Sequence, residues 1–127
     1  MSDTQPYILI VEDDRFLARA YQSKLANAGF RLGTAYDGEE AIAMLGQEKP
    51  DLMILDIIMP KKNGFEVLQE IQNHPEWKTI PVILLTNLGQ EEDRKKGQEL
   101  GAVDYIIKAD FSLQEIVTLI KKHLHQS

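Results

Sequence analysis

The stretch Asp51-Leu-Met-Ile-Leu-Asp56-Ile-Ile-Met-Pro60 decides the fold of this chain. Its apolar run, residues 52–55, is too short for a globular helix and lies between prolines at positions 50 and 60. This pattern predicts a strand that is buried on both faces, as in a parallel sheet. Asp56 stands at the carboxyl end of the strand, where burying an unpaired carboxylate costs free energy. The residue either has a partner or a chemical task, or it caps the strand at the surface, and this stretch alone favours the cap.

Four further apolar runs of strand length occur in the chain, and helical patterns lie between them. The additional strands are predicted at residues 7–11, 30–36, 80–85 and 103–107. The predicted helices include residues 17–28, 41–45, 65–71, 90–100 and 113–124. Strands that alternate with helices form βαβ units, which predicts an α/β fold: a five-stranded parallel sheet with helices on both faces.

Several residues indicate where these helices begin and end. Residues 37–40 and 112–115 resemble capping boxes, and Gly29 and Gly101 stand where helix ends are expected. The helix at 90–100 is polar nearly all round, so we expect it to be the least firmly docked of the five. We interpret His74, His123 and His125 as solvated side chains, and Trp77 as a local packing residue.

Length and composition limit the class of protein. We expect a single domain over residues 1–127, with an ordered core from about 6 to 125 and no output domain. The net charge of −6, from 14 basic and 20 acidic residues, argues against direct contact with nucleic acid. The absence of cysteine excludes disulfides and thiolate metal sites. Neither a signal peptide nor a membrane span is visible in the sequence, so a cytoplasmic location away from the membrane is the expectation.

Polar side chains with related chemistry follow four of the predicted strands. In chain order they are Glu12, Asp13, Asp14, Asp56, Thr86 and Lys108. In open parallel sheets, ligands bind outside the carboxyl ends of the strands. Each residue alone is weak evidence, because acids cap strands, threonine occurs in turns and terminal lysines are often solvated. Together, at four strand ends, they indicate a site for a phosphoryl group and a divalent cation.

The chemistry of such a cluster follows from its charges. Neighbouring carboxylates raise each other's pKa unless a cation neutralises them. Oxygen ligands suit Mg²⁺, which usually takes one or two protein carboxylates and keeps several waters. Lys108 acting alone as the counter-ion is the metal-free alternative. A carboxylate can also attack a phosphoryl group and form an aspartyl phosphate, with an ammonium and a hydroxyl group around the transferring oxygens.

Over essentially its whole length, the chain resembles the CheY-like receiver domain of bacterial two-component response regulators. The resemblance rests on Val11-Glu-Asp-Asp14, Leu55-Asp-Ile-Ile-Met-Pro60 with Asn63-Gly64, Thr86, Gly101-Ala-Val-Asp-Tyr105 and Lys108. This combination is specific, whereas no single piece is. The resemblance implies a flavodoxin-like (βα)5 single domain whose strands lie in the order 2-1-3-4-5.

The resemblance also implies a role for each site residue. Asp56 is expected to accept the phosphoryl group. Asp13 and Asp56 are expected to bind Mg²⁺ or Mn²⁺ directly and Glu12 through water, with the backbone carbonyl of Ile58 completing the protein's share of the coordination. Asp14 has no fixed role in the family, so capping the first helix is its expected task.

The remaining roles concern the response to phosphorylation. Thr86 and Lys108 are expected to bind phosphoryl oxygens, and Tyr105 is the switch aromatic whose orientation follows Thr86. The alternative for Tyr105 is an aromatic at the sheet edge with a wet hydroxyl. The surface formed by helix 90–100, strand 103–107 and the last helix would then change shape and contact a downstream protein.

The expected phosphodonor is a sensor histidine kinase, a phosphotransfer protein or a small phosphodonor, and the chain is expected to catalyse only its own phosphorylation and dephosphorylation. A monomer or a weak, phosphorylation-dependent dimer is the expected assembly.

Three departures from the family pattern stand near the site. Lys108 is followed by Ala109 instead of proline, and Asp110 lengthens the loop by one residue. Without proline a cis bond costs roughly 2.5–4 kcal/mol, so we predict a trans bond after Lys108 and a locally different loop. Asn87 replaces a small residue, which narrows access to Asp56. Apolar Ile58 and Leu88 flank the phosphoacceptor, so we expect slow loss of the phosphoryl group, because hydrolysis needs an oriented water.

Two other function classes remain as alternatives. A receiver fold that serves as a phosphorylation-independent interaction module is disfavoured by the complete set of site residues but favoured by the altered Lys108-Ala109 loop. A phosphohydrolase with an aspartate nucleophile is remote, because Ile58 occupies the position of the second acid in Asp-x-Asp. Dinucleotide binding is excluded, since Glu12-Asp13-Asp14 stands where a glycine-rich turn is required.

Overall fold

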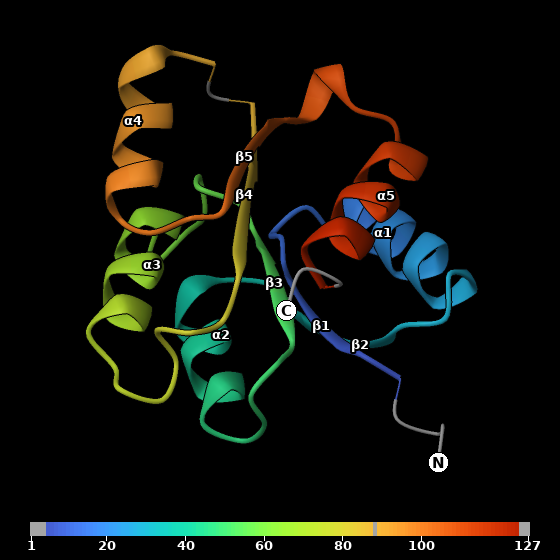
Figure 1. The fold of residues 1–127 in the computed structure, drawn as a ribbon, viewed down its shortest axis with the longest axis horizontal. Coiled ribbons are helices and arrows are strands. Elements are labelled where there is room, and N and C mark those ends of the chain that lie inside the picture. Colours follow the sequence, from blue (N-terminus) through green and yellow to red (C-terminus); the bar gives the residue numbers. More distant parts are fainter. Residues whose placement is uncertain (1–4, 88, 125–127) are drawn as a thin grey trace.

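The computed structural model describes residues 5–87 and 89–124. Strands and helices alternate along this part of the chain (Figure 1). The strands are β1 (Tyr7–Val11), β2 (Arg31–Ala35), β3 (Leu52–Leu55), β4 (Val82–Thr86) and β5 (Asp104–Ile107). The helices are α1 (Arg15–Asn27), α2 (Gly38–Leu45), α3 (Gly64–Gln72), α4 (Glu91–Glu99), the 3₁₀ helix η1 (Lys108–Asp110) and α5 (Leu113–Leu124).

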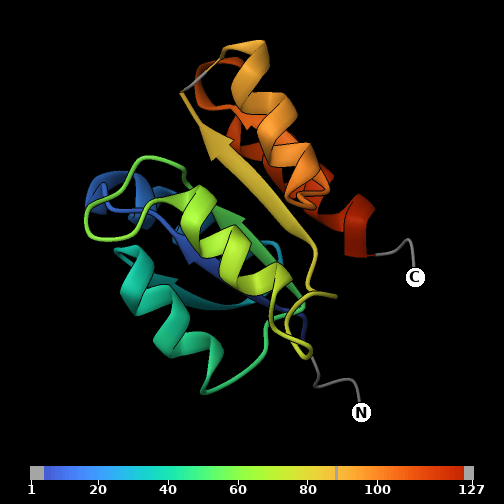
Figure 2. The ribbon, with the colours of Figure 1, turned by 90° about the vertical axis from the view of Figure 1, so that its left-hand side faces the viewer.

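The five strands form one parallel sheet in the order β2-β1-β3-β4-β5. Helices α2, α3 and α4 cover one face of the sheet, and α1 and α5 cover the other (Figures 1 and 2). The fold class and the strand order predicted from the sequence are therefore confirmed. In Figure 1 the strands run upward, so that their carboxyl ends form the upper edge of the sheet.

Burial on both faces explains why the central strands are continuous apolar runs. In β3, Met53 and Leu55 belong to the core beneath α2 and α3, whereas Leu52 and Ile54 belong to the core beneath α1 and α5. All four side chains are at most 2% exposed. A strand between two helical layers has no polar side, so the alternation of a half-exposed strand is lost.

Side chains at the helix starts satisfy free backbone amides. The Asp14 carboxylate accepts hydrogen bonds from the amides of Phe16 (3.0 Å) and Leu17 (3.1 Å), so the predicted cap of α1 is confirmed. Ser112 and Glu115 form the predicted capping box before α5.

The prediction for the start of α2 needs a correction. Asp37 does accept from the Glu40 amide, at 2.8 Å, but the Glu40 carboxylate accepts from the amide of Tyr36 and not from that of Asp37. The return bond of the box is therefore made to Tyr36, one residue before the N-cap.

Helix α4 has the polar character that the sequence predicts. Of its nine residues, only Gly97 is buried, and its N-cap, Gln90, makes no side-chain capping bond. Its C-terminal end is closed by Gly101, which adopts a φ of +95°, a left-handed conformation that suits glycine. Helix α4 thus buries little side-chain surface of its own, although its C-cap residue, Leu100, packs against the core.

The interpretation of the histidines is wrong in one case. His123 of α5 is only 11% exposed at its side chain, and its Nε2 lies 3.1 Å from Oδ2 of Asp104 at the start of β5. His74 stacks on Trp77 with ring centroids 3.8 Å apart, and Trp77 packs against the core as predicted. His125 lies outside the described residues.

Candidate functional site

The backbone of the sheet places Glu12 and Asp56 side by side at its carboxyl edge. Val11 and Leu55, the last residues of β1 and β3, are paired in register. The Asp56 amide donates to the carbonyl of Val11 at 3.0 Å, and the Glu12 amide donates to the carbonyl of Ala35 at 3.0 Å. Each acid is therefore held by a hydrogen bond that extends the strand ladder by one residue beyond the strand.

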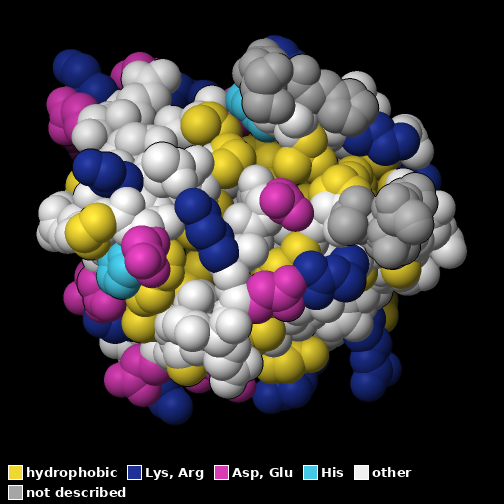
Figure 3. Space-filling model, turned by 60° about the horizontal axis from the view of Figure 1, so that its bottom comes forward, with side chains coloured by type: hydrophobic (Ala, Val, Ile, Leu, Met, Phe, Trp, Pro, Cys, Tyr) yellow, Lys and Arg dark blue, Asp and Glu magenta, His cyan; other side chains and the backbone are white. Residues whose placement is uncertain are grey.

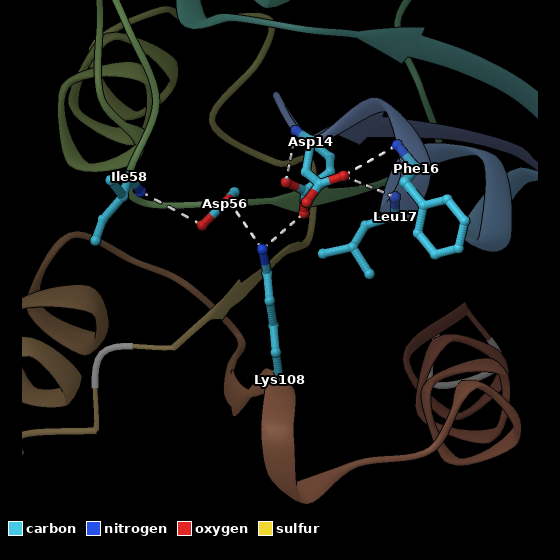
Figure 4. A network of polar contacts seen from close by, with 7 residues as sticks. Asp14, Phe16, Leu17, Asp56, Ile58 and Lys108 are labelled. Atoms are coloured by element: carbon cyan, nitrogen blue, oxygen red, sulfur yellow. Dashed lines mark hydrogen bonds and ion pairs between the residues drawn. The ribbon is translucent and has the colours of Figure 1, made fainter.

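Lys108 connects these two acids across the pocket (Figure 4). Its Nζ lies 2.8 Å from Oε1 of Glu12 and 3.0 Å from Oδ2 of Asp56. The Lys108–Ala109 peptide bond is trans, as predicted, and residues 108–110 form the 3₁₀ helix η1, which is the locally different loop. The replacement of proline by Ala109 thus leaves the lysine able to reach both carboxylates.

The burial of Glu12 changes its proton affinity. Glu12 is 2% exposed and Asp56 is 6% exposed. Burial raises the pKa of Glu12 to about 7, although the hydrogen bond from Lys108 opposes this shift. Burial also acts to lower the pKa of Lys108, but its contacts with Glu12 and Asp56 outweigh this, and the pKa is raised. Lys108 therefore stays charged at neutral pH, and Glu12 lacks full compensation for its own charge.

Asp13 adds a third carboxylate to the same pocket. One carboxylate oxygen from each of Glu12, Asp13 and Asp56 lies within 4.8 Å of the others, and Asp13 is the exposed member. Asp14 points away to cap α1, while its amide donates to Oε2 of Glu12 at 3.1 Å (Figure 4). A small cation at the open side of the pocket could therefore contact oxygens from two strand ends.

The loop between β3 and α3 closes tightly against the carboxyl end of β3. A Cβ placed on Gly64 would lie 2.3 Å from the carbonyl oxygen of Asp56, so a side chain at this position does not fit. Lys61 adopts a φ of 68°, which is rare for a residue other than glycine, and its Nζ lies 3.6 Å from Oδ2 of Asp37. Asn63 and Glu66 form a reciprocal capping box at the start of α3. The loop is thus fixed at both ends.

Ile58 lies within this loop, directly beside the phosphoacceptor predicted from the sequence. Its amide is 3.4 Å from Oδ1 of Asp56, and its side chain is 59% exposed. An exposed apolar side chain thus lies two residues after Asp56, as the sequence predicts. Leu88, its expected partner, lies outside the described residues.

Thr86 ends β4 and is fully buried. It is paired in register with Ile107, the residue before Lys108, so Thr86 and Lys108 lie at adjacent strand ends. The six polar residues that follow the strands therefore meet at one edge of the sheet, except that the Asp14 carboxylate serves the helix instead of the pocket.

Tyr105 lies in β5, three residues before Lys108, and its ring faces α4. The residue is only 5% exposed, although β5 is the edge strand of the sheet. The guanidinium carbon of Arg94 lies 5.0 Å from the ring centroid, and Nη1 of Arg94 donates to the Tyr105 carbonyl at 3.3 Å. Sequence reasoning missed Arg94, because helical spacing alone cannot show which strand residue a polar side chain contacts.

This fold and this cluster of strand-end residues define a class of signalling domain. The sequence model of the family described as "Response regulator receiver domain" matches residues 8–121. The chain therefore belongs to the response regulator receiver domain family of two-component systems, a family of signalling proteins.

Curated relatives extend this finding. The chain is 45% identical over 121 residues to the transcriptional regulatory protein CpxR of Klebsiella pneumoniae subsp. pneumoniae (strain HS11286), covering 94% of this chain and 50% of the relative. It is 41% identical over 125 residues to a probable transcriptional regulator, ycf27, of Guillardia theta, covering 98% of this chain and 48% of the relative. The chain thus spans about half the length of the curated relatives it matches.

Solved structures agree with the fold. The chemotaxis protein CheY4 of Vibrio cholerae superposes with a TM-score of 0.87 at 26% identity, covering 94% of this chain and 98% of the other. The Mn²⁺-bound response regulator Rcp1 superposes with a TM-score of 0.86 at 31% identity, covering 96% of each chain. The phosphorylated cyanobacterial phytochrome response regulator RcpA superposes with a TM-score of 0.81 at 36% identity, covering 94% of this chain and 91% of the other.

The transcriptional role in the names of CpxR and ycf27 concerns proteins about twice as long as this chain. It qualifies the expectation that nucleic acid is not a direct partner, which stays a prediction for residues 1–127 alone. On the face in Figure 3, at the opposite end from the site, Lys and Arg side chains are interspersed with Asp and Glu. Among the described residues, no helix combines the length and apolarity that a membrane crossing requires.

Proposed function

We propose that this receiver domain accepts a phosphoryl group on Asp56 in a reaction that depends on Mg²⁺ or Mn²⁺. The donor would be a sensor histidine kinase, a phosphotransfer protein or a small phosphodonor. The observation that carries the proposal is the contact of the Lys108 ammonium with both buried acids, Glu12 and Asp56, beside the exposed carboxylate of Asp13.

Asp56 is suited to be the nucleophile because it is buried yet lies beside the exposed carboxylate of Asp13. One of its carboxylate oxygens would attack phosphorus, while the bond from phosphorus to the donor nitrogen or oxygen breaks and its electron pair leaves with the donor. An acyl phosphate results; a carboxylate donor such as acetyl phosphate leaves as the ionised carboxylate, and a phosphohistidine donor leaves as the imidazole. The burial of the carboxylate limits hydration, which would otherwise weaken its attack.

Lys108 and Thr86 would bind the oxygens of the transferred group. The Lys108 ammonium is already 3.0 Å from Oδ2 of Asp56, so a small movement would bring it to a phosphoryl oxygen. Thr86, buried at the adjacent strand end, could donate its hydroxyl to another oxygen. Such groups are positioned before the reaction, so they stabilise charge without reorganising.

The donor set fits a hard divalent cation. Asp13 would bind it directly, Glu12 through water, and the backbone carbonyl of Ile58 would complete the protein's share. When bound, the cation supplies charge neutralisation for the phosphoryl oxygens and the carboxylates. The raised pKa of Glu12 supports this assignment, because the buried carboxylate still lacks compensation by Lys108 alone.

Esterification of Asp56 would then change the face formed by α4, β5 and α5. Thr86 would move toward the new phosphoryl oxygens, and Tyr105 would follow into the space. The light anchoring of α4 supports this face as the one that moves and contacts a downstream protein.

The test is intact mass after incubation with acetyl phosphate and Mg²⁺. We expect the wild-type chain to gain one phosphoryl group and Asp56→Asn to gain none. Asp13→Asn is expected to lower the apparent Mg²⁺ affinity by at least about tenfold. Asp14→Asn is the matched control, because the Asp14 carboxylate caps α1 and does not face the other acids, so this variant should leave the affinity nearly unchanged. A parallel incubation with a metal chelator tests the metal-free alternative: full phosphorylation in the presence of the chelator would show that the reaction needs no divalent cation. If the wild-type chain gains no phosphoryl mass under any condition, the phosphorylation-independent interaction module is favoured.

We further propose that the phosphoryl group is lost slowly. Two residues after Asp56, Ile58 presents an exposed apolar side chain, which offers no hydrogen bond to orient a hydrolytic water. Ile58→Asn with Leu88→Glu is therefore expected to speed dephosphorylation by about tenfold or more, followed as loss of the added mass after removal of acetyl phosphate. An unchanged rate would contradict this explanation of the lifetime.

A further inference from the structure

Among the described residues, three arginines lie over tyrosine rings, and they differ in what their N–H groups contact. The guanidinium carbons lie at these distances from the ring centroids: 4.0 Å for Arg15 over Tyr36, 4.6 Å for Arg31 over Tyr7 and 5.0 Å for Arg94 over Tyr105. A guanidinium that stacks on a ring by its face still has its N–H donors in the plane, available to an acceptor. The acceptor of these donors therefore indicates the task of each arginine.

The donors of two of these arginines are occupied. Arg31 donates from both terminal nitrogens to the carboxylate of Glu48, and Nη1 of Arg94 donates to the carbonyl of Tyr105 at 3.3 Å. Arg15 is different, because within residues 5–87 and 89–124 its guanidinium makes no hydrogen bond or ion pair. Arg15, which is exposed, thus presents a planar fork that can bind an oxyanion through two parallel hydrogen bonds.

The Arg15–Tyr36 pair lies at the carboxyl edge of the sheet, on the β2 side of the acidic cluster. Tyr36 directly follows β2, and the carbonyl of Ala35, the residue before it, accepts the Glu12 amide at 3.0 Å. Arg15 is the first residue of α1 and comes two positions after Asp13, the exposed acid of the cluster. The free fork and the acids therefore stand on neighbouring loops of one edge.

Two lysines of the same edge already have carboxylate partners. Lys108 contacts both Glu12 and Asp56, and Nζ of Lys61 lies 3.6 Å from Oδ2 of Asp37. Unlike these lysines, Arg15 has no carboxylate partner within the described chain, so its charge is available to a ligand.

An anion is released at this edge when the phosphodonor is an acyl phosphate. A carboxylate oxygen of Asp56 attacks phosphorus, the bond from phosphorus to the acyl oxygen breaks, and its electron pair leaves as a carboxylate without proton uptake. In an in-line displacement the leaving oxygen lies opposite the attacking one, away from buried Asp56. With phosphoramidate, the phosphorus–nitrogen bond breaks instead, and the already protonated nitrogen leaves as ammonia, which carries no charge.

We propose that Arg15 binds the leaving carboxylate of small acyl phosphates and thereby selects these donors over donors that release a neutral amine. This inference rests on the proposed function, because it concerns the donor of the same phosphoryl group. A fork that stabilises the charge developing on the leaving oxygen accelerates the transfer. Tyr36 acts as a positioning residue, since the stacked ring restricts a long side chain before the anion binds and so reduces the entropy lost on binding.

The experiment follows the phosphorylation of the full chain by intact mass over time, with Mg²⁺ and subsaturating acetyl phosphate or phosphoramidate. Arg15→Gln is expected to lower the rate with acetyl phosphate about two- to fivefold, the size of an exposed ion pair, and to leave the rate with phosphoramidate nearly unchanged. Arg15→Lys keeps the charge but loses the fork, so its rate with acetyl phosphate should lie between those of the wild type and Arg15→Gln. The difference should shrink at high ionic strength, where exposed charges are screened.

Matched variants separate donor binding from a general effect. Arg19→Gln removes one positive charge from another exposed position of α1 and should behave like the wild type with both donors. Tyr36→Phe keeps the stacked ring and should also match the wild type, whereas Tyr36→Leu should lose part of the rate with acetyl phosphate. Titration with acetate alone should shift the Nε–H resonance of Arg15 and leave that of Arg31, whose donors Glu48 holds.

The inference would be overturned by an unchanged rate of Arg15→Gln with acetyl phosphate, by equal losses with both donors, or by an equal loss in Arg19→Gln. An Arg15 resonance that acetate does not shift would overturn it as well, and a wild-type rate in Tyr36→Leu would refute the role given to the ring. A wild-type chain that neither donor phosphorylates would instead remove the proposed function and this inference with it.

Discussion

Helices α4 and α5 lie on opposite faces of the sheet beside the edge strand β5, and they are held in different ways (Figure 1). Helix α5 buries Ile116, Val117 and Ile120 against the sheet and begins with a reciprocal capping box. Helix α4, of similar length, buries only Gly97 and has no side-chain cap. The same edge of the domain thus has one side with extensive apolar burial and one side on which the helix buries few of its residues.

This difference indicates which of the two helices can move at the lower cost in free energy. Local opening requires the loss of the contacts that an element makes, and few buried apolar contacts mean a low opening free energy. Moving α4 would therefore expose less of the core than moving α5, which would uncover the apolar layer beneath it. The contrast leads to three predictions.

The largest expected effect is on the α5 side. Ile120→Ala deletes a fully buried side chain and should lower the free energy of unfolding by about 2–5 kcal/mol, measured by urea denaturation. Lys95→Ala on α4 removes no buried contact and should stay within about 0.5 kcal/mol of the wild type. Comparable losses for the two variants would contradict the difference between the helices.

An intermediate effect is expected from exchanging the helix caps. Ser112→Ala removes the cap of α5 and should cost about 1 kcal/mol, because Ser112 accepts from the Glu115 amide. Gln90→Ser supplies α4 with the cap that it lacks and should stabilise it by up to about 1 kcal/mol.

Native-state hydrogen exchange is the measurement for the cap exchange. Amides of α4 should exchange through local opening in the wild type and become better protected in Gln90→Ser. If the amides of α4 and α5 were equally protected in the wild type, the expected difference in local stability between the two helices would be wrong.

The smallest effect is expected from the contact between α4 and α3. Lys96→Met removes the ammonium that lies over the Phe65 ring and should destabilise the chain by about 0.5–1 kcal/mol at most. The loss should appear in the exchange of α4 amides before it appears in global unfolding. A loss as large as that of Ile120→Ala would mean that α4 is held by more than its polar contacts.

Much of this architecture could be predicted from local pattern. The apolar run of residues 52–55 predicted a strand with two buried faces, and the cap of Asp14 followed from residue type and position. Strand ends supplied the list of polar residues, because the carboxyl ends of parallel strands meet at one edge. The strand order itself came from family resemblance, since periodicity does not determine which strands are neighbours.

The features that were missed depend on contacts between distant residues. His123 and Asp104 are 19 residues apart, and only the docking of α5 beside β5 brings their side chains to 3.1 Å. Arg94 and Tyr105 meet because Gly97 allows a close approach of α4, which no local pattern reveals. The Asn63–Glu66 capping box is different: its signal was present in the sequence and was overlooked.

No side chain fits at Gly64, because the first residue of α3 packs directly on the backbone at the end of β3. If Asp56 gains a phosphoryl group as proposed, we expect the added volume to displace the lightly anchored helix α4 more readily than the start of α3. The outer surfaces of α2 and α3 would then stay nearly unchanged.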